Sequence, residues 1–218
     1  MNLVHYNIIV NSIPSHVTLV AVSKMRTPAQ IQTLYDAGQR VFGENRPIEL
    51  EAKYETLPKD IEWHFIGHLQ TNKIKHIAPF VSLIHSIDSF SLLQEVNRHA
   101  EKHHRVISCL LQFFIAQETT KYGLSWEECI AILESPVFST LKNISISGVM
   151  GMATFTEDKV LIREEFKKLH HYFLQLKARY FVNQPDFKEI SMGMSDDYTI
   201  AIEESSTIVR IGSAIFNE

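Results

Sequence analysis

A lysine follows the first apolar run of the sequence. Residues Val17 to Val22 are mostly apolar, and Ser23 and Lys24 come directly after them. The run has too little alternation for a strand with one wet face, so it predicts a strand of a parallel sheet that is covered on both sides. A lysine just past a strand is usually a solvated loop residue, but α/β folds bind ligands at this end of their strands. A partly desolvated lysine amine there can attack an aldehyde and form a Schiff base.

Two loops near the end of the chain have residues that suit a phosphate group. The segment "EISMGMSDD" contains Gly193 and Ser195 after one apolar run, and "TIVRIGSAIF" places Gly212 and Ser213 after the last run. Glycines let backbone N–H groups approach phosphate oxygens, and serine hydroxyls add neutral donors. Either loop alone is explained equally well by a helix cap at Ser195 or a turn at Gly212. Together, after the last two strands, they favour a phosphate site.

The elements around these residues follow a repeated pattern of strand and helix. After the first run, Thr27 and Pro28 are typical of an N-cap and a first helical position, Ile31 and Leu34 have helical spacing, and Gly38 ends the segment. Apolar runs that predict strands recur at 17–23, 40–43, 61–66, 81–87, 107–114, 144–151, 187–192 and 207–211.

Eight strands joined by helical segments favour a closed (β/α)8 barrel of the TIM type. Parallel strands need long crossovers, and the helical stretches between the runs supply them. The length of 218 residues is short beside the ~250 typical of this fold. A doubly wound open sheet is the alternative.

Two of the predicted helices have specific signals. A stripe of apolar residues after the sixth strand predicts an amphipathic helix, formed by Ile162, Phe166, Leu169, Phe173, Leu176 and Tyr180. After the seventh strand, Ser195 occupies a predicted N-cap position. Asp196 and Asp197 would then lie in the first turn, where a helix favours carboxylates, and would point away from a bound anion.

Composition limits the class of protein. A formal net charge of -4 and a pI near 6.3 argue against bulk attraction to nucleic acid or to anionic membrane. The two cysteines, Cys109 and Cys129, are too few and too far apart to indicate a disulfide framework or a zinc site. No apolar window approaches a membrane span and no signal peptide is visible, so we expect a cytoplasmic protein. With no linker, and only six residues after Gly212, residues 1–218 are expected to form one domain.

A series of ordered motifs resembles a known family. The sequence is similar to the pyridoxal phosphate homeostasis protein family, whose members are single-domain barrels that bind pyridoxal phosphate (PLP) and resemble the alanine racemase N-terminal domain. The similarity runs from Val17 to Phe216 and rests on "AVSK", "RVFGENR", "WHFIGHLQTNK", "HSIDS", "KYGL", "GVMGMA", "MGMSDD" and "VRIGSAIF".

The resemblance implies a role for each candidate residue. In the family, the lysine of the AVSK motif carries PLP as an internal aldimine, the MGMSDD and RIGS motifs hold the phosphate, and the arginine of VRIG faces the pyridine nitrogen. The asparagine of the GEN motif lies near the cofactor. The implied cofactor-binding residues are therefore Lys24, Asn45, Ser195, Arg210, Gly212 and Ser213.

The expected function is that of a PLP carrier. An arginine can only donate to the pyridine nitrogen, so the ring remains a weak electron sink. Alanine racemases, which resemble this barrel, add a second domain and a partner subunit that supply an opposing tyrosine, and nothing of that size follows Gly212. We therefore expect a monomer that stores or delivers PLP with little turnover, with apo PLP-dependent enzymes as candidate recipients. The alternatives are a small amino-acid racemase with a base such as His64, and an aldolase that uses Lys24 without cofactor.

Overall fold

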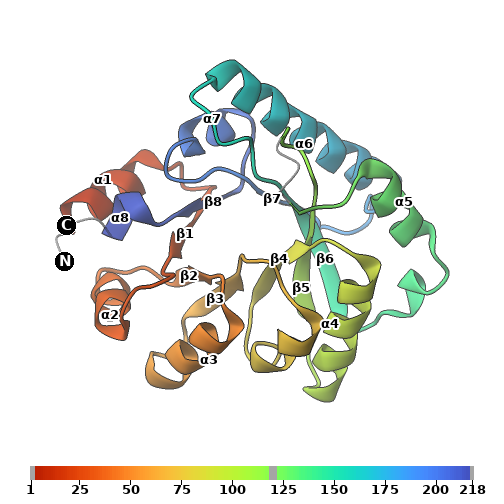
Figure 1. Cartoon of the computed structure of the whole chain (residues 1–218), viewed down its shortest axis with the longest axis horizontal. Coiled ribbons are helices and arrows are strands. Elements are labelled where there is room, and N and C mark those ends of the chain that lie inside the picture. The colour runs from red at the N-terminus through yellow and green to blue at the C-terminus, as the bar shows by residue number, and fades with distance from the viewer. Residues whose placement is uncertain (1–2, 118–121, 217–218) are drawn as a thin grey trace.

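The strands form a closed parallel barrel. The computed structural model describes residues 3–117 and 122–216, so Lys121 of the KYGL motif and both ends of the predicted 1–218 domain lie outside the described residues. Each strand pairs with the next one, and the last pairs with the first (Figure 1). The strands are β1 Thr18–Val22, β2 Val41–Glu44, β3 Glu62–Phe65, β4 Leu83–Ile87, β5 Ile107–Gln112, β6 Ile144–Met150, β7 Glu189–Ser191 and β8 Ile208–Ile211. The predicted TIM-type barrel is confirmed, and the open-sheet alternative is wrong.

Helices cover the outside of the barrel (Figure 1). The helix α1 precedes the barrel and packs against α8 at the other end of the described chain. The connection after β3 contains only the short 3-10 helix η1. In chain order the helices are α1 Val4–Ser12, α2 Pro28–Asp36, α3 Pro47–Thr56, η1 Thr71–His76, α4 Phe90–Lys102, α5 Trp126–Glu134, η2 Phe138–Thr140, α6 Lys159–Arg179, α7 Tyr198–Glu203 and α8 Ser213–Phe216.

The start of α2 agrees with its sequence signals. The hydroxyl of Thr27 accepts a hydrogen bond from the Gln30 backbone, and the Gln30 side chain accepts one from the Thr27 backbone, which makes a capping box. Ile31 and Leu34 are buried against the barrel. Gly38 has a φ of +103°, a conformation that favours glycine, and it allows the chain to turn back into β2.

The long helix α6 buries its predicted apolar stripe. Ile162, Phe166, Leu169 and Leu176 are buried in the main core, whereas Phe173 and Tyr180 pack against that core and stay partly exposed. The stripe prediction is confirmed because a helix that covers a barrel presents one face to the strands.

The helix after β7 starts later than predicted. The N-cap of α7 is Asp197, so the prediction that Ser195 is the N-cap is wrong. The carboxylate of Asp197 accepts a hydrogen bond of 2.5 Å from the backbone N–H of Met194. This bond closes a turn over residues 194–197 and moves the helix start, which leaves the Ser195 side chain outside the helix.

The barrel has two apolar regions. The larger one lies between the strands and the surrounding helices. The smaller one lies inside the barrel and contains Val20, Leu83, Leu110, Met150 and Ile208. Within the described residues, no helix is both long and apolar enough to cross a membrane.

Candidate functional site at the carboxyl end of the barrel

Four neighbouring strands bring the predicted site residues to one side of the barrel. In the closed barrel, β7, β8, β1 and β2 follow one another around the circumference. Parallel strands all end at the same face, so residues at or just past these strand ends share one region. They are Ser195 after β7, Arg210, Gly212 and Ser213 on and after β8, Lys24 after β1 and Asn45 after β2.

The two predicted phosphate loops meet through their serines. The hydroxyl of Ser213 donates to the hydroxyl of Ser195 over 3.0 Å. Gly212 lets the loop after β8 pack closely on β1, because a Cβ atom there would lie 3.1 Å from the Val22 Cβ and carbonyl oxygen. Gly193 has a φ of +95°, which turns the chain directly after β7. The structure thus places two hydroxyls from different loops side by side.

Arg210 lies inside the barrel with its side chain fixed. It is 4% exposed, and its guanidinium donates to the Ser191 hydroxyl at 2.6 Å and to the Gly151 carbonyl at 3.3 Å. Burial lowers the pKa of Arg210 to about 10, against an opposing effect of the nearby Asp197 carboxylate. The guanidinium therefore keeps its charge at neutral pH, and these two bonds leave some of its five N–H groups for other acceptors.

Lys24 differs from the expectation in one respect. It follows β1 in a turn that is closed by a 3.0 Å bond from the Arg26 backbone N–H to the Ser23 carbonyl. The side chain is exposed, so the predicted partial desolvation of Lys24 is wrong for this structure. The reason is the turn, which carries Lys24 and Met25 beyond the packed end of the strand; Met25 is 84% exposed.

Directly below this turn is a buried ion pair that the sequence analysis missed. Lys53 of α3 donates to the Glu44 carboxylate at 2.6 Å and to the Ser23 carbonyl at 2.9 Å. The Ser23 hydroxyl also donates to Glu44, at 2.6 Å. The second carboxylate oxygen, Glu44 Oε2, is buried without a hydrogen-bond partner in the described residues. The pair ties the end of β1 to β2 and α3, and the only sequence signal for it was a glutamate within an apolar strand.

Asn45 extends from the same strand as Glu44. It is half-buried and lies against the loop after β3, where a Cβ on Gly67 would come within 2.5 Å of the Asn45 carbonyl oxygen. This close approach fixes the backbone at Asn45, which directly follows the last residue of β2.

His64, which was considered as a base at this end, lies elsewhere. It is 6% exposed and lines a cavity with Thr18, Glu62 and Ile208, which are the first residues of β1, β3 and β8. The cavity is therefore at the amino end of the barrel. The expectation that His64 lines the carboxyl end is wrong, because its position in the middle of β3 directs it into the barrel interior.

A different histidine lies at the carboxyl end. His68 Nδ1 is 3.0 Å from a carboxylate oxygen of Asp88, and the His68 ring stacks on Tyr122 with 4.1 Å between the centroids. These residues follow β3, β4 and β5, away from the four strands of the candidate site. In the described part of the chain, no group of three or more His, Cys, Asp or Glu side chains is placed to hold a metal ion.

Comparison with known sequences identifies relatives that match most of the chain. Residues 5–218 match the family described as "Alanine racemase, N-terminal domain". A pyridoxal phosphate homeostasis protein from Aquifex aeolicus is 39% identical over 201 residues, which are 92% of this chain and 86% of the relative. The protein of the same name from Escherichia coli is 33% identical over 207 residues, or 93% and 86% of the two chains.

Comparison with solved structures identifies the same kind of relatives as the sequence comparison. PipY of Synechococcus elongatus, solved without PLP, superposes with a TM-score of 0.91 at 32% identity over 98% of both chains. The same protein with PLP bound gives 0.86 at 31% identity, also over 98% of each chain. An alanine racemase from Bartonella henselae, at 16% identity, shares the fold over 98% of this chain and 57% of its own, with a TM-score of 0.72. The predicted resemblance is confirmed: the chain belongs to the pyridoxal phosphate homeostasis protein family, within the wider family of the alanine racemase N-terminal domain.

Proposed function

We propose that this chain binds PLP at the carboxyl ends of β7, β8, β1 and β2, and that it stores or delivers the cofactor in PLP homeostasis. The observation that carries the proposal is the convergence of an amine, a pair of hydroxyls and a charged guanidinium on these neighbouring strands. The relatives support it, because PipY has been solved with PLP bound and the curated relatives are named for PLP homeostasis.

The loops after β7 and β8 suit the phosphate of PLP. Ser195 and Ser213 offer two hydroxyls that already lie 3.0 Å apart, so one phosphate group can accept from both. Ser213 also begins α8, and the first backbone N–H groups of a helix have no partner within it. The nearby Asp197 carboxylate accepts from the Met194 N–H through one of its oxygens, which holds it in the turn.

Arg210 suits the pyridine nitrogen of the cofactor. Its guanidinium is held by Ser191 and by the Gly151 carbonyl, and its remaining N–H groups can donate to a ring nitrogen. A guanidinium with a pKa of about 10 keeps its own proton at neutral pH and does not protonate the ring. PLP supplies an electron sink that is strongest when its ring nitrogen is protonated, so a donor of this kind weakens that chemistry.

Lys24 supplies the amine for covalent attachment. Its exposed side chain follows β1, the strand between β8 and β2, and can bond to the aldehyde carbon of PLP with loss of water. The ion pair of Glu44 and Lys53 fixes the start of the turn through the Ser23 carbonyl. Asn45, at the end of β2, flanks Lys24 on the side away from Arg210.

The remaining parts of the proposal concern how the protein acts. We propose that the barrel is a single PLP-binding domain, that it works as a monomer in the cytoplasm, and that apo PLP-dependent enzymes receive its cofactor. A small amino-acid racemase remains the second candidate, favoured by the fold that the chain shares with alanine racemases. The base for that reaction cannot be His64, which lies at the amino end.

Borohydride trapping tests the binding site. Protein incubated with PLP and reduced should retain the cofactor on the peptide that contains Lys24. Lys24→Ala should lose this covalent product, whereas Lys75→Ala, which removes an exposed lysine of η1, should retain it. Equal covalent yield in Lys24→Ala and in the unchanged protein would contradict the assignment of Lys24.

A further inference from the structure

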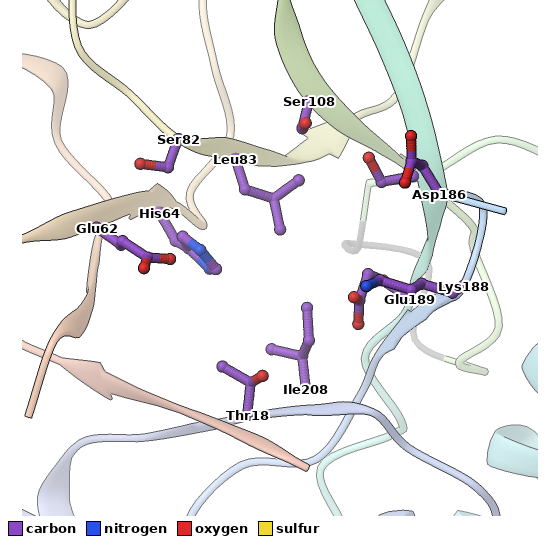
Figure 2. A pocket seen from close by; sticks show the side chains of 11 residues that line it. Thr18, Glu62, His64, Ser82, Leu83, Ser108, Asp186, Lys188, Glu189 and Ile208 are labelled. Carbon is purple, nitrogen blue, oxygen red and sulfur yellow. The ribbon is translucent and has the colours of Figure 1, made fainter. Parts of the chain in front are cut away.

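The cavity lined by His64 opens at the amino end of the barrel, on the opposite face from the proposed PLP site. Its volume is about 300 Å³. Figure 2 shows its side chains in a ring, with Glu62 and His64 on one side and Lys188 and Glu189 on the other. The apolar side chains of Leu83 and Ile208 lie between them and belong to the apolar cluster inside the barrel.

A chain of hydrogen bonds joins this cavity to Arg210. Arg210 donates to Ser191 Oγ at 2.6 Å, and Ser191 Oγ lies 2.8 Å from His85 Nδ1. His85 Nε2 lies 3.0 Å from His64 Nδ1. Ser191 and His85 are fully buried, and His64 is 6% exposed and lines the cavity.

Arg210 determines which group donates and which accepts in each of these hydrogen bonds. Arginine has no acceptor atom, so Ser191 must accept from Arg210. No other acceptor for the buried Ser191 hydroxyl exists among the described residues, so its proton goes to His85 Nδ1. His85 is neutral, because burial lowers its pKa well below 6.5, and its single ring proton is therefore on Nε2 and is donated to His64 Nδ1.

The last N–H of the chain is at the cavity. Burial lowers the pKa of His64 to about 3, so His64 is also neutral and its proton is on Nε2. Within the described residues, no hydrogen bond reaches Nε2, although the ring is almost wholly buried and lines the cavity. Nε2 is not among the buried side-chain atoms that lack a partner, so it is open to the cavity, where a ligand can present an acceptor to it.

The rim of the cavity is acidic and favours a positively charged group. Glu62, Asp186 and Glu189 carry three carboxylates, against the single ammonium of Lys188. Glu62 and Asp186 are exposed, and their carboxylates make no hydrogen bond or ion pair with the described residues, whereas the carboxylate of Glu189 accepts from Thr207. The rim therefore favours a positive charge, and a simple anion would be repelled.

We propose that this cavity is a second small-molecule site for a compact zwitterion, with its carboxylate accepting from His64 Nε2–H and its ammonium group near Glu62, which lies on the same side of the cavity. A zwitterion satisfies the deep donor and the acidic rim together, whereas a simple cation leaves His64 unpaired. The ligand would be linked through Ser191 to Arg210. Any effect of this link on PLP binding rests on the proposed function. The cavity site and the hydrogen-bonded link to Arg210 do not depend on it.

Nitrogen-15 spectra of histidine-labelled protein without PLP test the site. Glycine is the probe, with acetate and methylammonium as its two halves. A ligand with so few heavy atoms should bind in the millimolar range, at about 1–10 mM. Glycine should shift His64 Nε2, and each half should do so far more weakly. No shift with glycine, or equal shifts with acetate, would overturn the proposal.

A variant at the exposed rim tests the ammonium contact without disturbing the core. Glu62→Gln should weaken glycine binding about two- to fivefold, as for an exposed ion pair. Glu157→Gln makes the same charge change on an exposed residue between β6 and α6, outside the cavity, and should leave glycine binding unchanged. Equal weakening by Glu157→Gln would show that the contact with Glu62 is absent.

The link to Arg210 has its own readout. In arginine-labelled protein without PLP, glycine should shift the guanidinium resonances of Arg210. Ser191→Ala should abolish this shift, because it breaks the hydrogen-bonded path between His85 and Arg210. An Arg210 shift that persists in Ser191→Ala would overturn the link. If these tests give the expected results and the borohydride test does not, the cavity site stands and the PLP proposal is wrong.

Discussion

The hydroxyl of Ser213 donates a 3.0 Å hydrogen bond to the hydroxyl of Ser195, so the loops after β8 and β7 meet at one point. Neither residue is held in a buried core, and Ser195 is displaced from the helix by the turn at Asp197. Both hydroxyls can therefore rotate toward a common ligand.

Removing either hydroxyl should weaken PLP much more than pyridoxal. A hydrogen bond to a charged group is worth about 1.5–3 kcal/mol, so Ser195→Ala and Ser213→Ala should each weaken PLP about 10- to 100-fold. Pyridoxal lacks the phosphate and should change little. Absorbance titration measures both ligands, and Ser139→Ala, on the exposed η2 segment, is the control.

The two substitutions should not be additive. The serines contact each other, so the double variant should lose less affinity than the sum of the single losses. Equal weakening of PLP and pyridoxal in either single variant would contradict the assignment of these loops to the phosphate.

With Arg210 at the ring nitrogen of PLP, we expect slow exchange of the α-proton of bound amino acids. With a protonated guanidinium facing the ring nitrogen, PLP-loaded protein in deuterated water should exchange the α-proton of L-alanine barely faster than free PLP does. Proton NMR follows the loss of the α-proton signal. An ordinary enzyme would accelerate the reaction by ~10⁶-fold or more. Rapid exchange that depends on Lys24 would favour the racemase alternative.

The buried pair of Glu44 and Lys53 should be important for folding stability. Lys53→Met leaves Glu44 buried without its partner, and such a change costs about 3–5 kcal/mol in the free energy of unfolding. Urea denaturation measures the loss. Glu44→Gln combined with Lys53→Met should lose less, because no uncompensated charge remains. Lys75→Met changes an exposed lysine and should have little effect.

The loss in Lys53→Met should also depend on pH. Burial raises the pKa of Glu44 above 4.5, and Lys53 limits that rise. A raised folded pKa means that stability is greatest below the unfolded pKa and falls as pH rises through the folded pKa. Without Lys53 the pKa rises further and Glu44 takes up a proton more easily, so the loss should be smaller at pH 5 than at pH 8. A loss that is the same at both values would be inconsistent with an unpaired carboxylate.

The buried histidines should make the fold sensitive to mild acid. Burial lowers the pKa of His64 to about 3 and that of His85 well below 6.5. A depressed folded pKa gives stability that is present above the unfolded pKa and is lost as pH falls from 6.5 toward the folded value. The slope approaches about 1.4 kcal/mol per pH unit for each histidine.

Denaturant unfolding between pH 6.5 and 5 measures this slope. His64→Asn retains a hydrogen-bonding group without a titrating ring and should flatten the dependence. His16→Gln changes an exposed histidine and should leave it unchanged. A ring signal of His64 that titrates near pH 6.5 would show that the side chain is not buried as described.

The sequence alone determined the barrel and the location of the candidate site. Apolar runs without alternation predicted strands covered on both sides, and helical segments between them required parallel crossovers. Once the strands are parallel, their carboxyl ends must lie on one face, so Lys24, Arg210 and Ser213 could be placed on that face before any contact was known. Capping residues such as Thr27 are local, and they too were predictable.

Only the tertiary structure decided which polar residues meet inside the barrel. Ser191 and His85 are 106 positions apart, and their contact depends on barrel closure and strand stagger, which no local pattern encodes. The same applies to Lys53, whose amine reaches Glu44 only because α3 packs against β2. Alternation along β3 shows that His64 and Glu62 share a face, but the layer of the barrel that His64 occupies is fixed by its pairing with β2 and β4. For this reason His64 lies at the amino end and Lys24 in an exposed turn, against the expectation from sequence.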